Sequence, residues 1–142
     1  MPSKFTNSFS VKIKPIHALT WLLLVTVLLC LPGKALPDTG GNWFDRLYMD
    51  KWIHVFLFSV LVYLSCRAIP HSYAAFRGII LQYVIMAVVG VLYGVLIEFV
   101  QLWLISGRGF EEYDILADTA GCALGYIIGV RRSGSRNSDK QA

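Results

Sequence analysis

Four long apolar segments constrain this chain more than any other feature of its sequence. They are Ile16–Leu31, Trp52–Ile69, Ile79–Ile105 and Ile115–Val130. A helix that crosses a bilayer needs about 17–25 mostly apolar residues, so the second and third segments are long enough, and the other two need flanking residues. None of the segments alternates with the period of two that a barrel strand requires. The pattern predicts an all-α fold: a polytopic membrane protein built as a bundle of four transmembrane helices.

The composition agrees with a membrane protein and argues against a soluble enzyme. Hydrophobic residues make up 56% of the 142 residues and charged residues only 15%, whereas a soluble domain carries about 25% charged residues. The net charge of +4 does not indicate a nucleic-acid partner, because the basic residues stand at segment ends instead of forming one stripe. The three cysteines lie in apolar runs and match no metal-binding spacing. We expect no nucleic-acid partner, no cofactor and no metal.

The distribution of Lys and Arg predicts the orientation in the membrane. Nine of them lie in the amino-terminal segment, the second loop and the tail, against four in the first and third loops. Because cytoplasmic loops are enriched in Lys and Arg, both termini are expected in the cytoplasm. The expected organisation is a cytoplasmic segment (1–15), a membrane domain (16–130) and a disordered cytoplasmic tail (131–142). A cleaved signal peptide is the alternative for the first apolar segment, and the remaining helices keep their orientation in either case.

Ionisable residues gather at the expected outer ends of the apolar segments, where they mark a functional site by default. Asp50 and His54 open the second segment and share a helix face, because they stand four residues apart. Glu98 and Gln101 lie near the end of the third segment. With the orientation above, three stretches of chain deliver polar groups to one membrane level, and the cluster is completed by Lys51, Arg108, Asp114 and Asp118.

Glycines extend two of these polar faces. Gly94 and Glu98 share one face of the third segment, and Asp118 and Gly125 share one face of the fourth. Small residues at such spacing let membrane helices approach closely. We therefore expect the two glycine faces to pack against each other, which would turn the carboxylates toward the bundle interior.

The residue types of the cluster suggest two kinds of role. His54 and Glu98 are the groups best suited to transfer protons, as candidate catalytic residues. Arg108 is the natural bidentate partner of a carboxylate or of a lipid phosphate. The candidate ligand-binding residues are Asp50, Lys51, Gln101, Arg108, Asp114 and Asp118. Two alternatives remain open: a network that only clamps the helices together, and a divalent cation held by Glu98, Asp114 and Asp118.

Four motifs, in this order, resemble the VanZ-like family of small bacterial membrane proteins. Residues 50–58 resemble its D-K-x-x-H-F opening, and residues 98–101 resemble its E-x-x-Q element. Arg108 matches the arginine that comes next, and residues 114–121 resemble the D-x-L-x-N-x-x-G element. One position departs from the pattern: Asp118 stands where the family usually has asparagine, which adds a charge to the cluster.

The resemblance covers residues 50–129 and implies a cell-envelope role in the bacterial cytoplasmic (inner) membrane. The founding member of the family is associated with low-level teicoplanin resistance, an antibiotic-resistance role. The resemblance implies no defined reaction, so whether the chain is an enzyme stays open. Whether it forms a homo-oligomer also stays open. Two functions are compatible with these residues. One is binding of, or action on, an envelope lipid or a lipid-linked cell-wall component. The other is a non-catalytic protein that modulates envelope properties or a partner complex.

Overall fold

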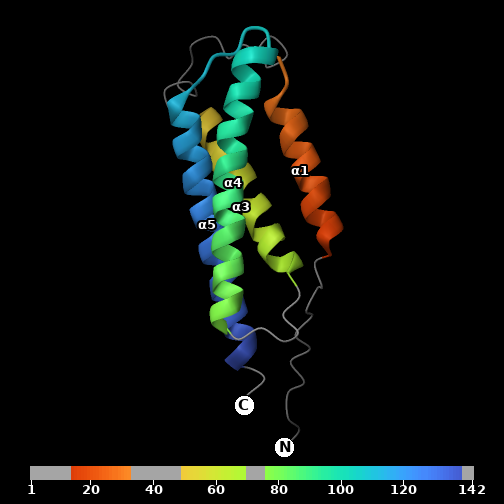
Figure 1. Ribbon diagram of the computed structural model, residues 1–142, viewed down its shortest axis with the longest axis vertical. Helices are drawn as coiled ribbons and strands as arrows, with labels where there is room; N and C mark the ends of the chain where they lie inside the picture. Colours follow the sequence, from red (N-terminus) through yellow and green to blue (C-terminus); the bar gives the residue numbers. More distant parts are fainter. Residues whose placement is uncertain (1–13, 33–48, 70–75, 139–142) are drawn as a thin grey trace, which may run out of the picture.

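The computed structural model describes residues 14–32, 49–69 and 76–138, and this part of the chain is helical without strands. The helices are α1 (Pro15–Leu29), α3 (Met49–Ala68), α4 (Phe76–Leu104) and α5 (Glu112–Ser138) (Figure 1). Pro15 opens α1, where its fixed φ suits the first helical turn and its missing N–H is not needed. The all-α class predicted from the sequence is confirmed.

Three of the helices are long and apolar enough to cross a membrane. These candidate spans are Met49–Ala68, Gly78–Leu104 and Glu112–Gly134. Helix α1 is apolar but has only 15 residues, which corresponds to about 22 Å at 1.5 Å per residue. The hydrocarbon core of a bilayer is about 30 Å thick. Length and composition therefore identify a membrane protein with three candidate spans and one shorter apolar helix.

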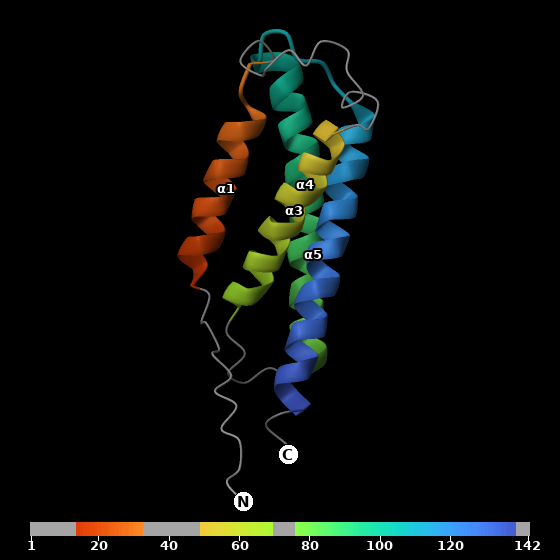
Figure 2. The ribbon, with the colours of Figure 1, turned by 180° about the vertical axis from the view of Figure 1, so that it is seen from behind.

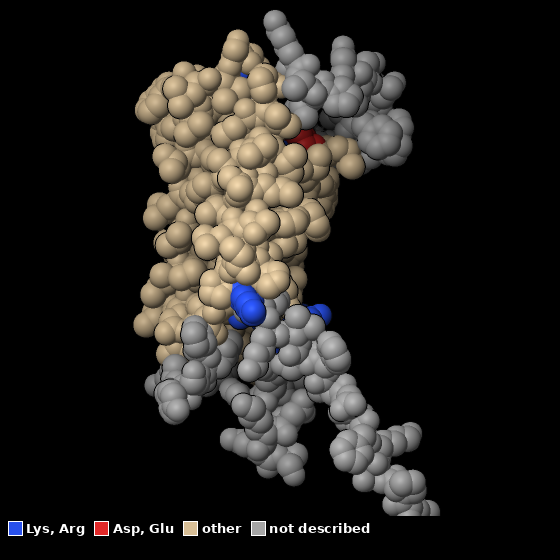
Figure 3. All heavy atoms as spheres, turned by 90° about the vertical axis from the view of Figure 1, so that its right-hand side faces the viewer, with Lys and Arg blue, Asp and Glu red and all other residues tan. Residues whose placement is uncertain are grey.

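The helices alternate in direction along the bundle. Helices α1 and α4 run toward one end, and α3 and α5 begin there and run back (Figures 1 and 2). We call this the polar end, because the acidic atoms visible in Figure 3 lie near it, whereas most of the visible Lys and Arg atoms lie toward the opposite end. Helices α3 and α5 are therefore parallel neighbours, and they form the most extensive helix contact in the bundle.

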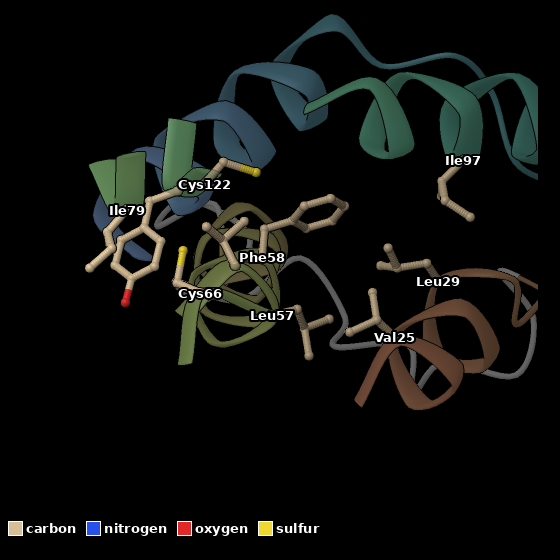
Figure 4. Packing of buried hydrophobic residues seen from close by; sticks show 10 residues of the cluster. Val25, Leu29, Leu57, Phe58, Cys66, Ile79, Ile97 and Cys122 are labelled. Atoms are coloured by element: carbon tan, nitrogen blue, oxygen red, sulfur yellow. The ribbon is translucent and has the colours of Figure 1, made fainter. Parts of the chain in front are cut away.

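The apolar core joins all four helices. Phe58 of α3 and Tyr83 of α4 are fully buried in it, together with Cys122 of α5. Val25 and Leu29 of α1 point toward α3 and α4 (Figure 4). Many large apolar side chains on the outer faces of α4 are exposed instead. A helix that is apolar on its outer face as well as its inner face is suited to lipid rather than water.

Helix α5 extends beyond the last apolar segment and revises the expected tail. The sequence predicted disorder from Arg131, whereas the helix continues to Ser138, and residues 139–142 lie outside the described part of the chain. Ser133 explains part of this difference, because its buried hydroxyl lies 2.7 Å from the hydroxyl of Tyr83 on α4. A single polar contact of this kind leaves no signal in the hydropathy of the tail.

The predicted packing of the glycine faces of α4 and α5 holds on the α4 side only: glycines of α4 meet side chains of α5, whereas Gly121 and Gly125 of α5 meet α3. Gly94 of α4 receives a side chain: a Cβ added there would lie 2.6 Å from Oδ2 of Asp118. Gly121 of α5 faces α3, where an added Cβ would lie 2.5 Å from the carbonyl oxygen of Val55. Gly125 meets the Ser59 carbonyl of α3 in the same way. The glycines of α5 thus allow close approach to the backbone of α3.

Gly125→Ala should therefore destabilise the protein, because the new methyl group meets backbone that cannot rotate away. Overpacking of this kind typically costs about 1–3 kcal/mol. Gly134→Ala is the matched control on the same helix, since a Cβ there meets nothing within 4 Å, and alanine favours a helix by up to about 1 kcal/mol. Thermal unfolding of both variants in detergent measures the difference. Equal stability of the two variants would contradict the close contact between α3 and α5.

Candidate functional site

The structure places most of the predicted polar residues in the interior of the polar end. Glu98, Gln101 and Asp118 are at most 1% exposed, and His54 and Asp114 are 4% exposed. Asp50 is exposed at the start of α3, and Lys51 and Arg108 are half-buried. Four parts of the chain deliver this cluster: the first turns of α3, the last turns of α4, the connection after α4, and the first turns of α5.

Lys51 is the centre of an ion-pair network between α3 and α5. Its Nζ lies 2.6 Å from Oδ1 of Asp114 and 2.8 Å from Oδ2 of Asp50. It also lies 2.5 Å from Oε2 of Glu111, in the connection before α5. The Asp114 carboxylate is 5% exposed, whereas those of Asp50 and Glu111 are 59% and 57% exposed. The network is therefore buried on its α5 side and open to solvent on the other.

His54 forms a buried pair with Asp118 one turn deeper in the bundle. Its Nδ1 lies 2.8 Å from Oδ1 of Asp118, and its Nε2 lies 3.9 Å from Oδ1 of Asp114. Asp118 Oδ2 is buried and has no hydrogen-bond partner. The carboxylate thus orients the imidazole ring. Glu98, the other candidate for proton transfer, makes no hydrogen bond with His54 among the described contacts.

Glu98 holds the connection between α4 and α5. Its Oε2 accepts a hydrogen bond of 2.9 Å from the backbone N–H of Glu111, and its Oε1 is buried without a hydrogen-bond partner. Arg108, expected from the sequence as a carboxylate partner, forms no salt bridge with Glu98 among residues 14–32, 49–69 and 76–138. The hydrogen-bond partner of Glu98 is therefore a backbone N–H of the connection and not the guanidinium group of Arg108 that the sequence suggested.

Gln101 attaches α1 to the bundle. Its Nε2 donates a hydrogen bond of 2.8 Å to the carbonyl oxygen of Leu29, which stands at the end of α1. The last four carbonyls of a helix have no partner within the helix, so this contact satisfies one of them. Trp21 of α1 adds a second polar contact, because its Nε1 donates a 3.0 Å hydrogen bond to the Leu57 carbonyl of α3. Gln101 therefore helps to position α1.

Glu111 is a participant that the sequence did not predict. It contributes its carboxylate to Lys51 and its backbone N–H to Glu98, so it joins the two halves of the cluster. Its spacing to Asp114 was the available signal, because residues three apart at a helix start face the same side. It stands in a short polar connection, outside the four apolar segments and the motifs that mark their ends.

The donor groups do not support the divalent-cation alternative. Glu98, Asp114 and Asp118 do not form a set of donor atoms within reach of one metal ion in the described residues. Asp50, Glu111 and Asp114 do, with atoms within 4.8 Å of one another, but the ammonium group of Lys51 lies against all three carboxylates. A positive charge of the chain itself therefore neutralises part of this acidic group.

A groove of about 530 Å³ opens beside this network, between α3 and α5. Lys51 lines its polar end, and the other walls are apolar or aromatic: Trp52, Val55, Tyr113, Leu116 and Ala117. Trp52 and Leu116 are 64% and 63% exposed, so the groove faces outward rather than into the bundle. The cluster thus has a closed interior part, around His54 and Glu98, and an open part at the groove.

Burial should decide how strongly each carboxylate couples to Lys51. In double-mutant cycles, Lys51→Met combined with Asp114→Asn should show a coupling energy well above that of Lys51→Met with Glu111→Gln. The Glu111 carboxylate is exposed, and exposed ion pairs contribute about 0.2–1 kcal/mol. Breaking a buried pair costs about 3–5 kcal/mol. Unfolding free energies of the single and double variants in detergent give both couplings, and equal values would show that the buried geometry does not hold in the folded protein.

Comparison with known proteins identifies one family. The family model described as VanZ/LLP1 matches residues 3–131, a range that contains the whole polar cluster and the groove. No curated protein and no solved structure matches the chain.

Proposed function

This chain belongs to the VanZ/LLP1 family, as the four motifs predicted, and we propose that it binds an envelope lipid or the lipid part of a lipid-linked cell-wall component. The observation that carries this proposal is the groove between α3 and α5, which is polar at one end and apolar along its length. An amphiphile has a polar headgroup at one end and a hydrocarbon chain along its length, so its two parts match the two parts of the groove.

The groove has a suitable size and position for part of a lipid. Its volume of about 530 Å³ falls within the range of about 300–1,000 Å³ that is usual for small-molecule sites. Its apolar walls belong to helices that are candidate membrane spans, so a hydrocarbon chain can reach them from the bilayer. Trp52 and Tyr113 line the groove near the polar end, and such amphipathic rings are enriched at the level of lipid headgroups.

The charges at the groove mouth favour a headgroup that donates hydrogen bonds. Lys51 is surrounded by the carboxylates of Asp50, Glu111 and Asp114, so one positive charge meets three negative ones. The two exposed carboxylates keep lone pairs available for hydroxyl or ammonium groups. A role in glycopeptide resistance, which the family resemblance implies, would result if the bound molecule is a cell-wall precursor.

The geometry favours binding over acid–base chemistry. His54 and Glu98 do not line the groove, and both are nearly or fully buried. A general base must come within hydrogen-bond distance of the proton that it removes, and the closed packing around His54 keeps a bound lipid away from it. The non-catalytic alternative, a modulator of envelope properties, shares this binding step and differs only in the effect of the bound lipid on the envelope.

We further propose that α1 also crosses the bacterial inner membrane, which gives four spans with both termini in the cytoplasm. The alternating helix directions support an even number of spans (Figure 1). The accumulation of Lys and Arg away from the polar end supports the orientation, because positive residues favour the cytoplasmic side (Figure 3). A short span is accommodated by local thinning of the bilayer or by flanking residues.

The orientation is tested by labelling a cysteine introduced at Thr39, in a chain whose three native cysteines are replaced. A membrane-impermeant maleimide should label it in intact cells, because the loop before α3 is proposed to lie outside. A cysteine introduced at Ser138 is the control and should react only after lysis. Reaction of the Thr39 cysteine only after lysis would place the polar end in the cytoplasm and overturn the proposed access to the groove.

Leu116→Trp should block lipid binding by filling the groove. Leu124→Trp is the matched control, because Leu124 is an exposed leucine on the same helix that does not line the groove. Native mass spectrometry of the purified full chain with phosphatidylethanolamine, phosphatidylglycerol or undecaprenyl phosphate measures the occupancy. We expect one of these probes to bind the unaltered chain and the control alike, and to bind Leu116→Trp at least tenfold more weakly.

Two results would contradict the lipid proposal. One is binding of all three probes in the same proportion by Leu116→Trp and by the unaltered chain, which would locate the lipids elsewhere on the surface. The other is the absence of any lipid from the unaltered chain purified from its membrane in mild detergent. Thermal unfolding of each variant shows beforehand whether the substitution has left the fold intact.

A further inference from the structure

Two carboxylate oxygens in the interior of the polar end have no hydrogen-bond partner. They are Oε1 of Glu98 and Oδ2 of Asp118, on side chains that are 0% and 1% exposed. The second oxygen of each carboxylate is engaged, by the Glu111 N–H and by His54 respectively. Burial of an unpartnered polar atom is costly, and for a charged group it is more so. Both oxygens are therefore available to a ligand that the protein encloses.

The two carboxylates come from neighbouring helices, Glu98 from α4 and Asp118 from α5. Asp118 Oδ2 points at Gly94 of α4, where an added Cβ would come within 2.6 Å of it. Glu98 stands one helical turn from Gly94 on the same face of α4. The two carboxylates are also near enough to interact electrostatically. Asp118 therefore fills the space that a side chain at position 94 would take, on the helix face that also carries Glu98.

The charges around this pair do not balance. From α3, the cluster receives Lys51 and His54. Lys51 already contacts three other carboxylates, and His54 lies against Oδ1 of Asp118. From α5 comes a further acid, Asp114, and the connection before α5 carries Glu111 and Arg108, the latter without a salt bridge to Glu98. Uncompensated negative charge at the depth of the membrane is strongly disfavoured, so a bound cation or proton would stabilise the interior.

We propose that Glu98 and Asp118 bind one small monovalent cation, either Na⁺ or a proton carried by water, at the interface of α4 and α5. A divalent ion is a poor fit, because no third His, Cys, Asp or Glu among the described residues forms a group of donor atoms with these two carboxylates. The site is separate from the groove, since neither Glu98 nor Asp118 lines it. It is therefore a second site, and it does not depend on lipid binding.

The cation is detected through its effect on the stability of the full chain in detergent. For Na⁺, the unfolding midpoint should rise by about 3–6 °C for each tenfold increase in concentration above the dissociation constant. Choline chloride keeps the ionic strength constant. Glu98→Gln should abolish the rise, because an amide carries no charge. Glu111→Gln is the matched control: it removes an exposed carboxylate, leaves the N–H that Glu98 accepts, and should keep the rise.

A bound proton gives a different result in the same experiment. Na⁺ should then have no effect, and stability should fall as the pH rises and the proton is lost. Glu98→Gln should show a clearly smaller fall than the unaltered chain, and Glu111→Gln should behave like the unaltered chain. Asp118→Asn serves as a second variant, and equilibrium dialysis with radioactive Na⁺ measures binding directly if Glu98→Gln does not fold.

The proposal is wrong if the unaltered chain responds to neither Na⁺ nor pH. It is equally wrong if Glu98→Gln and Asp118→Asn both keep the full response of the unaltered chain. Neither result bears on the groove, because Leu116→Trp and the lipid probes examine a different face of α5. Failure of one proposal therefore leaves the other intact.

Discussion

The close approach of α5 to α3 is the contact on which the rest of the polar end depends. Gly121 and Gly125 bring the backbones of the two parallel helices together. Because the helices are in register at these glycines, they are also in register one and two turns nearer the polar end. Asp118 therefore meets His54, and Asp114 meets Lys51. The paired residues are 64 and 63 positions apart in the sequence. The glycines set the distance between α3 and α5, and the ion pairs lie at the end of the bundle where these two helices begin.

This arrangement divides the polar end into two environments with different chemistry. The carboxylates of Asp50 and Glu111 are exposed and contact Lys51, which lines an outward-facing groove. Those of Glu98 and Asp118 are enclosed and have one oxygen each without a hydrogen-bond partner. Burial thus divides the carboxylates into two sets: the exposed ones can contact a lipid headgroup, and the enclosed ones can contact only a small ion. The proposed lipid and cation sites both depend on this division.

Helix α1 is held differently from the other three. It is short and contributes few fully buried residues, and in a bilayer apolar surface alone gives little drive for helices to associate. Polar side chains supply the attachment. Gln101 binds the last turn of α1, Trp21 binds the backbone of α3, and the hydroxyl of Thr26 lies 2.8 Å from that of Tyr93. A residue of the family motif thus acts as a helix anchor.

The sequence alone determined the helical class, the membrane environment, the family and the end of the bundle at which the acids gather. Segment length and hydropathy decide the first two, and the periodicity of a helix places Asp50 with His54 and Gly94 with Glu98. Periodicity states which residues share a face, but it does not state which helix that face meets. In a chain whose helices are apolar on their outer as well as their inner faces, hydrophobicity does not distinguish the neighbours. Only the tertiary structure decided that the glycines of α5 face α3, that Glu98 binds a backbone N–H instead of Arg108, and that Gln101 holds α1. It also decided the role of Glu111 and the extension of α5 to Ser138, because both involve contacts between residues far apart in the sequence.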